Sequence, residues 1–487
     1  MGRSMPGTGR ERKTKAVGKK MRKEKFDKKE LFETLPVPRA LAAMAVPTII
    51  SQLITLVYNM VDAFFIGQTG NSFMVAAISL TLTLVIMLTS LSNLFGVGGG
   101  SLAARLMGVV QEEECRRVSA FSVYGAVAVA LTYSLLIGLF MNPLLYFLGA
   151  SEQTIGYARQ YTFLVIVCGA AFSMVSMTLA HLLRNAGYSG KASMGLSAGG
   201  ILNMGLDPLF MFVLLPKGNE VAGAALATLM SNMASCGYLL FAYRKASRTA
   251  PLSLSVKQAR KIKRESVRKL FGVGVPSAIL TGLFDVANVC VNMLASAHSD
   301  LALAGMGIVM KVERVPNAIN IGICQGAMPI IAYNFSSGDH DRMKKTVNTA
   351  RLWGLIVSFV SIALFELFAG QVTRLFMSTS RGDAENALRT IAYATLFLRV
   401  RCLASPQQFL NYHASFSMQA MGNGKGTMLH AFVRELVFYI PFMFLLDRLF
   451  GETGLAWALP AGELCGALFA MWLLHRSIHP AGREKSA

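Results

Sequence analysis

Long apolar runs alternate with short polar segments along almost the whole chain. Twelve such runs lie at residues 41–67, 73–105, 118–148, 154–184, 191–215, 221–245, 270–296, 301–333, 346–376, 388–421, 426–449 and 453–475. Each is long enough to cross a bilayer as a helix, which needs about 20 mostly apolar residues. The pattern predicts an all-α polytopic membrane protein with twelve transmembrane helices. Because the number is even, both termini are expected on one side of the membrane.

The composition agrees with a chain that faces lipid. Of 487 residues, 53% are hydrophobic and 15% are charged, whereas about a quarter of the residues in a soluble domain are charged. The formal net charge of +21 would raise the question of nucleic acid if the basic residues shared one exposed face. They lie between the apolar runs and at the termini instead. We therefore expect the lipid bilayer as a partner, no nucleic acid, and a monomer.

The basic residues also predict the orientation. They gather in the loops that follow the even-numbered runs, at Arg116, Arg117, Arg184, Lys191, the segment 244–269, Arg342, Lys344, Lys345 and Lys425. By the positive-inside rule these loops and both termini are cytoplasmic. The expected organisation is a basic, disordered cytoplasmic tail at 1–38, a six-helix N-lobe at 39–245, a basic linker at 246–268, a six-helix C-lobe at 269–476 and a short tail at 477–487.

The two halves repeat one another. Pro47 stands 229 residues before Pro276, and Gly98 stands 228 residues before Gly326. The pair Gly190-Lys191 precedes Gly424-Lys425 by 234 residues. A nearly constant offset indicates a duplication, although glycine and proline coincidences are an alternative. Because each half has six spans, a pseudo-two-fold axis along the membrane normal should relate the halves, with the substrate between them.

The sequence favours secondary active transport over other functions. The phosphate-binding motif GxxxxGK[ST] does not occur, so ATP is not expected as the direct driver. Neither a nucleophile–base pair nor a metal-ligand cluster stands out, so we expect no enzyme and no cofactor. A membrane receptor or scaffold that does not transport is the alternative from another class, and it would have no need of acids buried in one lobe.

Four polar residues are predicted to meet inside the first half. Asp62 lies about five residues from the outer end of its span. Asn203 and Asp207 are four residues apart on one helix face, and Thr228 lies about seven residues into its span from the same side. Their similar depth predicts one pocket rich in oxygen atoms, suited to a hard cation such as Na⁺ or to a shared proton. Pro208 should kink the helix beside Asp207. Simple hydrogen bonding between helices is the structural alternative.

The chain resembles the multidrug and toxic compound extrusion (MATE) family, especially its bacterial MepA-like and DinF-like branches. The resemblance covers roughly residues 36–475. It rests on VPTIISQLITLVYNMVDAFFIG, GVGGGSLAARLMG, RNAGYSGKASM, ILNMGLDPLFMFV, GAALATLMS, GICQGAMPIIAYNFSSGDHDRMKK and QAMGNGKGTM. It implies two six-helix lobes in a V and a location in the bacterial plasma membrane. It also implies alternating access and export of drugs or organic cations in exchange for Na⁺ or H⁺.

The resemblance also implies a cation-coupling site in the N-lobe. The residues that match the family's site are Asp62, Asn203, Asp207 and Thr228. Tyr58 and Asn59, one turn before Asp62, are candidates to line the substrate cavity. The C-lobe lacks acids at the equivalent positions, where Val291 stands opposite Asp62 and Val437 and Pro441 stand near the other counterparts.

Further charges in the second half leave the substrate open. Asp285 lies near a position where the NorM-like branch carries an acid. The other candidates are Lys311, Glu313, Arg314, Arg434 and Glu435. One interpretation is ion pairing between the eighth and eleventh spans. The other is that Lys311, Arg314 or Arg434 faces the cavity and selects an anionic or zwitterionic substrate. A lipid-linked saccharide flippase of the same superfamily is a related alternative.

Overall fold

The computed structural model describes residues 29–374 and 384–479. Nine helices within these ranges are long and apolar enough to cross a membrane, and the bent pair Ile155–Cys168 and Ala170–Asn185 makes a tenth span. The stretch Gly424–Ile478 contains two spans, because Gly451 breaks it with a φ of 58° and a ψ of −141°. Two shorter helices at Ala384–Cys402 and Ser405–Met421 form the remaining span. The twelve-helix prediction is therefore confirmed.

The first six spans lie in α2 to α9. Their bounds are α2 Val37–Gln68, α3 Ser72–Gly108, α4 Glu112–Leu139, α5 Met141–Phe147, α6 Ile155–Thr162, η1 Phe163–Cys168, α7 Ala170–Asn185, α8 Ser189–Pro208, η2 Leu209–Leu214 and α9 Glu220–Ala246. The η segments are π-helical turns. The predicted third span differs most, because α4 ends at Leu139 and the short α5 follows it.

The last six spans lie in α11 to α17, after the short α10 Val256–Arg260. Their bounds are α11 Arg264–His298, α12 Asp300–Ser337, α13 His340–Arg374, α14 Ala384–Cys402, α15 Ser405–Met421, α16 Gly424–Phe432, η3 Val433–Tyr439 and α17 Ile440–Ile478. Since α11 begins at Arg264, helix begins inside the predicted linker 246–268. The linker is also packed, with Leu252 and Ala259 buried.

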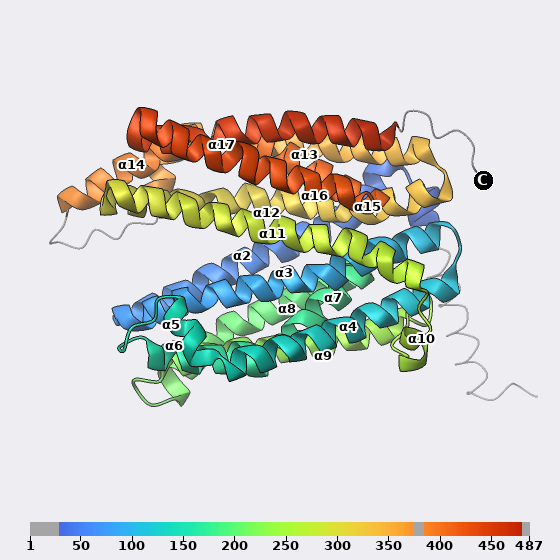
Figure 1. Ribbon diagram of the computed structural model, residues 1–487, viewed down its shortest axis with the longest axis horizontal. Coiled ribbons are helices and arrows are strands. Elements are labelled where there is room, and N and C mark those ends of the chain that lie inside the picture. Colours follow the sequence, from blue (N-terminus) through green and yellow to red (C-terminus); the bar gives the residue numbers. More distant parts are fainter. Residues whose placement is uncertain (1–28, 375–383, 480–487) are drawn as a thin grey trace, which may run out of the picture.

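The helices form two lobes. In Figure 1, α2 to α9 (blue to green) fill the lower half and α11 to α17 (yellow to red) fill the upper half. We call the end of the bundle that holds α10, the start of α2 and the end of α17 the basic end, since the loops rich in Lys and Arg lie there (right in Figure 1). Both ends of the described chain lie at this end, as an even number of spans requires.

Glycines bring the lobes into contact near the basic end, and these contacts follow the sequence repeat. A Cβ atom on Gly98 of α3 would lie 2.9 Å from the Cα of Gly274 in α11, and one on Gly326 of α12 would lie 2.5 Å from the Cα of Ala45 in α2. Gly98 corresponds to Gly326 and Ala45 corresponds to Gly274 at offsets of 228 and 229. The two contacts are therefore related by the pseudo-two-fold axis.

The lobes separate toward the opposite end. In α2 the buried residues run from Val37 to Ser51, and beyond Ser51 only Ile66 of this helix is buried. The hydrogen bonds between lobes lie in the half toward the basic end or near the middle, for example between Gln52 and Gln325 and between Asn93 and Thr281. The space between the lobes therefore opens at the end opposite the basic loops.

The chain before α2 differs from the predicted disordered tail at 1–38. Residues 29–33 form a helical turn, and the Phe32 ring stacks on Tyr333 of α12 with centroids 4.9 Å apart. The Arg342 guanidinium donates hydrogen bonds to the carbonyls of Leu31, Phe32 and Leu35 at 2.6–3.2 Å. These carbonyls lie at the end of a helical turn and lack partners within it, so the hydrogen bonds from Arg342 hold the segment against the C-lobe. Residues 1–28 lie outside the described chain.

Candidate functional site

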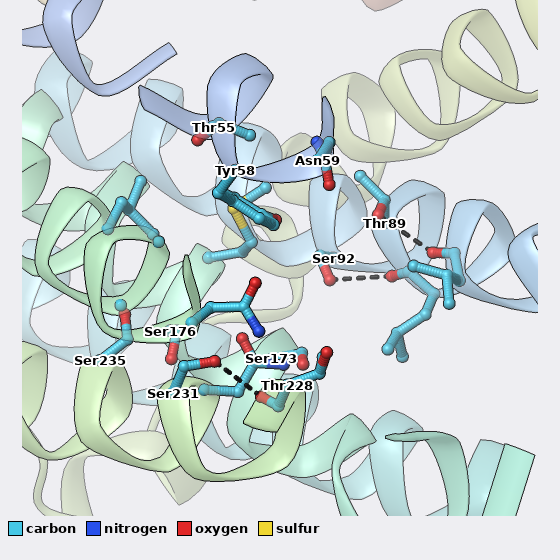
Figure 2. Close-up of a pocket in the computed structure, with 18 of the residues that line it drawn as sticks. Thr55, Tyr58, Asn59, Thr89, Ser92, Ser173, Ser176, Thr228, Ser231 and Ser235 are labelled. Atoms are coloured by element: carbon cyan, nitrogen blue, oxygen red, sulfur yellow. Dashed lines mark hydrogen bonds between the residues drawn. The ribbon is translucent and has the colours of Figure 1, made fainter. Parts of the chain in front are cut away.

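A cavity of about 230 Å³ lies within the N-lobe. Its polar lining includes side chains from α2, α3, α7, α8 and α9, many of them hydroxyls. Figure 2 shows Tyr58 and Thr55 above the cavity and Ser173, Ser176, Thr228 and Ser231 below it. Five of the six N-lobe residues predicted from the sequence, Tyr58, Asn59, Asp62, Asn203 and Thr228, line it, whereas Asp207 is fully buried and does not. Gln325 of the C-lobe also lines the cavity.

Two carboxylates belong to this site, Asp62 in the cavity lining and the buried Asp207, which is hydrogen-bonded to the lining residue Asn203. The Asn203 amide nitrogen donates a 3.2 Å hydrogen bond to Asp207 Oδ1. Asp207 is fully buried, and its charge interacts with that of Asp62. One buried oxygen of each acid, Asp62 Oδ1 and Asp207 Oδ2, has no hydrogen-bond partner. Carboxylates whose buried oxygens lack partners in a low-dielectric interior need a proton or a cation.

Two tyrosines complete the site around the acids. Tyr58 lies one helical turn before Asp62 in α2, and Tyr161 of α6 lines the same cavity as Thr228 of α9. Both phenol rings line the cavity. Tyr161 is absent from the sequence prediction because its span contains no acidic residue that would have marked it. The predicted four-residue set is thus brought together, and its role in cation coupling stays a prediction.

The local chain explains how Asp207 reaches the site. Asn203 and Asp207 share one face of α8, and Pro208 follows as the last residue of the helix. The helix then widens into the π-helical turn η2. Proline removes one backbone donor, and a π turn leaves further backbone groups outside the α-helical pattern. Among the described residues no group of three or more His, Cys, Asp or Glu is arranged to hold a metal ion. A coupling ion would therefore use hydroxyl and amide oxygens as well.

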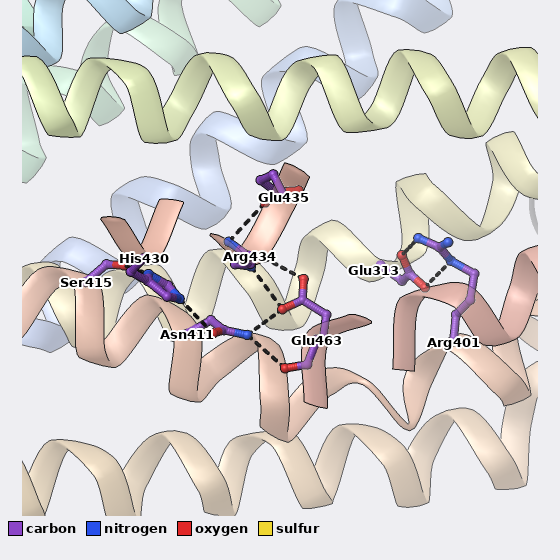
Figure 3. Close-up of polar contacts among 8 residues, drawn as sticks. All are labelled: Glu313, Arg401, Asn411, Ser415, His430, Arg434, Glu435 and Glu463. Atoms are coloured by element: carbon purple, nitrogen blue, oxygen red, sulfur yellow. Dashed lines mark hydrogen bonds and ion pairs between the residues drawn. The ribbon is translucent and has the colours of Figure 1, made fainter. Parts of the chain in front are cut away.

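The charged residues predicted in the C-lobe pair differently from expectation. Glu313 of α12 forms two 2.9 Å hydrogen bonds with Arg401 of α14. Arg434 of η3 binds Glu463 of α17 at 2.5 and 3.0 Å, and lies 3.5 Å from Glu435 (Figure 3). Pairing between the eighth and eleventh spans is therefore wrong. The pairs join the eighth to the tenth span and the eleventh to the twelfth, because the partners on these spans face one another.

Arg434 does not face the substrate cavity, because its side chain is 2% exposed. Lys311 and Arg314 of α12 are exposed. Lys311 stands eleven residues before Gly322, and Arg314 stands eleven residues before Gln325. Both Gly322 and Gln325 contact α2, and eleven residues make about three helical turns. Both therefore lie on the face of α12 turned toward the N-lobe. Asp285 lies in α11, and its side chain is outside the described part of the structure.

Sequence reasoning missed the partners of these charges. Arg401, Glu463, Asn411 and His430 are buried polar residues of the C-lobe. Arg401 and Glu463 are charges within apolar runs, and the same rule that selected Asp62 would have selected them. Asn411 and His430 carry no comparable signal in the sequence.

Comparison with known proteins places the chain. The MatE family model matches residues 47–214 and 276–445, one match in each lobe. The chain is 31% identical over 445 residues to "Multidrug export protein MepA" of Staphylococcus aureus strain MRSA252, covering 91% of this chain and 95% of that protein. It is 29% identical over 444 residues to the protein of the same name in Staphylococcus saprophyticus, with the same coverage.

A solved structure shares the fold. It is described as the outward-facing conformation of a multidrug resistance MATE family transporter of the MOP superfamily. It is similar with a TM-score of 0.84 and 20% identity, covering 92% of this chain and 97% of that one. The two repeats, the two-lobe fold and the match over both lobes lead to one conclusion: this chain belongs to the MatE family of MATE transporters.

Proposed function

We propose that the protein is a secondary active antiporter that exports drugs or organic cations across a bacterial plasma membrane in exchange for Na⁺ or H⁺. The observation that carries the proposal is the acid pair of the N-lobe, in which Asp62 and Asp207 each keep a buried oxygen without a partner. Relatives described as multidrug export proteins support the substrate class. The basic loops support an orientation with both termini in the cytoplasm.

The acid pair suggests how ion binding drives the transport cycle. In the state with the lobes apart at the outer end, Na⁺ or H⁺ enters the N-lobe cavity and neutralises Asp62 and Asp207. Neutralisation removes the repulsion between the two acids and allows the site to close. Substrate leaves the space between the lobes toward the outside. The lobes then break their contacts at the basic end and form contacts at the outer end. Release of the ion to the cytoplasm completes the cycle.

Transport by purified protein in proteoliposomes tests the coupling site. Ethidium export would be measured under imposed pH or Na⁺ gradients for wild type, Asp62→Asn and Asp207→Asn, with Asp341→Asn as the matched control on the exposed basic end. Both acid variants should lose gradient-driven export while Asp341→Asn retains it. Unchanged export in both acid variants would refute the assigned site. Ligand binding without any gradient-dependent flux would point to a receptor.

One observation favours a second candidate, the export of an anionic or zwitterionic substrate. Lys311 and Arg314 are exposed on the face of α12 that turns toward the N-lobe, so they add positive charge to the interlobe space. A cationic drug is repelled there, and an anionic group is attracted. Counterflow of labelled anions and cations would decide between the candidates. The variant Lys311→Gln/Arg314→Gln should lose anion transport if this candidate holds, with Lys345→Gln at the basic end as control.

A further inference from the structure

The centre of the C-lobe holds a polar network that the N-lobe mechanism does not use. We define the C-lobe network by the residues joined in Figure 3 apart from the separate Glu313–Arg401 pair: Asn411, Ser415, His430, Arg434, Glu435 and Glu463. They come from α15, α16, η3 and α17, and all are buried. Arg434 lies between the two carboxylates (Figure 3).

The hydrogen bonds of this network have a defined direction. The Asn411 amide nitrogen donates to the backbone oxygen of Glu463 at 3.1 Å and to its Oε2 at 2.6 Å. The Asn411 oxygen therefore faces His430 Nε2, 2.9 Å away, and must accept a hydrogen from it. His430 Nδ1 is then free to accept from the Ser415 hydroxyl at 2.8 Å. We infer the tautomer of a neutral His430 from these partners.

Asn411 and Arg434 together donate three hydrogen bonds to the carboxyl group of Glu463. Its Oε2 accepts from Asn411 and from Arg434 Nε, and its Oε1 accepts from Arg434 Nη2. Two of these three hydrogen bonds come from the Arg434 guanidinium, so the two side chains form a bidentate ion pair. The charge of Arg434 is thereby balanced by Glu463 alone.

Glu435 has no such stabilisation. It is 0% exposed, and neither of its carboxyl oxygens has a hydrogen-bond partner. Its nearest cation is the Arg434 guanidinium, whose Nη1 lies 3.5 Å from Glu435 Oε1. This guanidinium already pairs with Glu463. If both acids were ionised, the network would hold one uncompensated negative charge. Such a buried charge costs several kcal/mol, which is avoided when the group is neutralised.

The groups around Glu435 do not supply that neutralisation. Its charge interacts with Tyr439 of the same π turn and with Tyr412 of α15. Arg401 reaches the same tyrosine, Tyr439, but is already paired with Glu313. Phe284 of α11 packs near the Arg434 guanidinium, with its ring centroid 5.9 Å away. The side chain of Asp285 is outside the described part of the structure.

A proton fits this position better than a metal ion. A sodium ion on Glu435 would lie beside the Arg434 guanidinium and be repelled by it. Within the described residues no cluster of three or more His, Cys, Asp or Glu surrounds the carboxyl. We propose that Glu435 is a protonation site of the C-lobe, which binds and releases a proton separately from the acid pair of the N-lobe during transport. The link to transport rests on the proposed antiport, whereas protonation of Glu435 does not.

Infrared difference spectroscopy on the full-length protein in lipid vesicles tests the protonation without transport. Spectra taken on stepping from acidic to alkaline pH should contain the C=O absorption of a buried protonated carboxyl. Glu435→Gln should lose this component, and Glu435→Asp should keep it at a shifted frequency. The exposed control Glu385→Gln and the double variant Asp62→Asn/Asp207→Asn should retain it. The same component in wild type and in Glu435→Gln would overturn the proposal, as would its absence from both wild type and Glu435→Asp.

Proton release on substrate binding links the site to transport. Wild-type protein in weakly buffered detergent should release protons when ethidium is added, and Glu435→Gln should release fewer. Full release by Glu435→Gln would overturn the proposed function of Glu435 in the cycle. Failure of the N-lobe proposal would be seen in a different measurement. Gradient-driven export would then persist in Asp62→Asn and Asp207→Asn, whatever the result for the Glu435 variants. Thermal unfolding of Glu435→Asp checks that the lobe is folded.

Discussion

Replacing Gly326 with alanine should weaken the contact between lobes at the basic end. The new Cβ atom would lie 2.5 Å from the Cα of Ala45 and 2.7 Å from its nitrogen, whereas ordinary contacts begin near 3.4 Å. The backbones of α12 and α2 must therefore move apart by about 0.9 Å. Overpacking of this kind costs about 1–3 kcal/mol. Because the clash exists only while the basic end is closed, the closed state should lose population by about 5–150-fold relative to other states.

Distances between spin labels would measure this shift. Labels at Val109 in the N-lobe and Lys345 in the C-lobe, both exposed at the basic end, should show a larger population at long distance in Gly326→Ala. Gly307→Ala is the matched control, because Gly307 lies in the same helix with nothing within 4 Å of its Cβ position. It gains the same helix propensity without a clash. Identical distance distributions in the two variants would refute the reasoning.

Two other variants test the contacts described above. Arg401→Ala leaves the nearly buried Glu313 without its partner and should cost about 3–5 kcal/mol, while the double variant Arg401→Leu/Glu313→Leu should recover much of the loss. Thermal unfolding in detergent would measure the loss of stability and its recovery. Equal melting temperatures for the single and double variants would contradict the predicted recovery. Arg342→Gln removes hydrogen bonds to three carbonyls of residues 31–35, and limited proteolysis before α2 should accelerate by at least about tenfold. Lys344→Gln should leave the cleavage rate unchanged, and an unchanged rate in Arg342→Gln would show that the segment is held by other contacts.

The arrangement of the fold follows from the sequence because its signals are strong and local. Runs of about twenty apolar residues predict spans whatever they pack against. The offset between Gly98 and Gly326 reports a duplication, and the structure shows the same two positions in equivalent contacts between lobes. In the N-lobe, Asp62, Asn203, Asp207 and Thr228 meet because residues at one depth on neighbouring helices are adjacent.

The C-lobe was harder to predict because its interactions depend on which helix faces which. One of the two interpretations paired the charges of the eighth span with the eleventh, but the partner of Glu313, Arg401, comes from the tenth. Sequence gives the depth of each charge and not the order of the helices around the lobe. The helical turn at residues 29–33 was missed for a related reason, since its stabilising contacts with Tyr333 and Arg342 come from residues about 300 positions away.

The π-helical turns affect how each lobe tolerates a change in chain length. A π turn carries an extra residue within an otherwise regular helix, so deletion of one residue there restores an α-helix and leaves the chain beyond it in nearly the same rotational position, whereas the same deletion in a regular α-helix rotates what lies beyond by about 100°. In the N-lobe, η2 ends at Leu214, close to the loop before α9, so such a deletion would alter only the end of a span. In the C-lobe, η3 lies in mid-span with Arg434 and Glu435 inside it. A deletion there would disturb Arg434 and Glu435 while the first residues of α17 keep their packing, so this helix should accept a one-residue deletion within η3 more readily than one in the regular helix beside it.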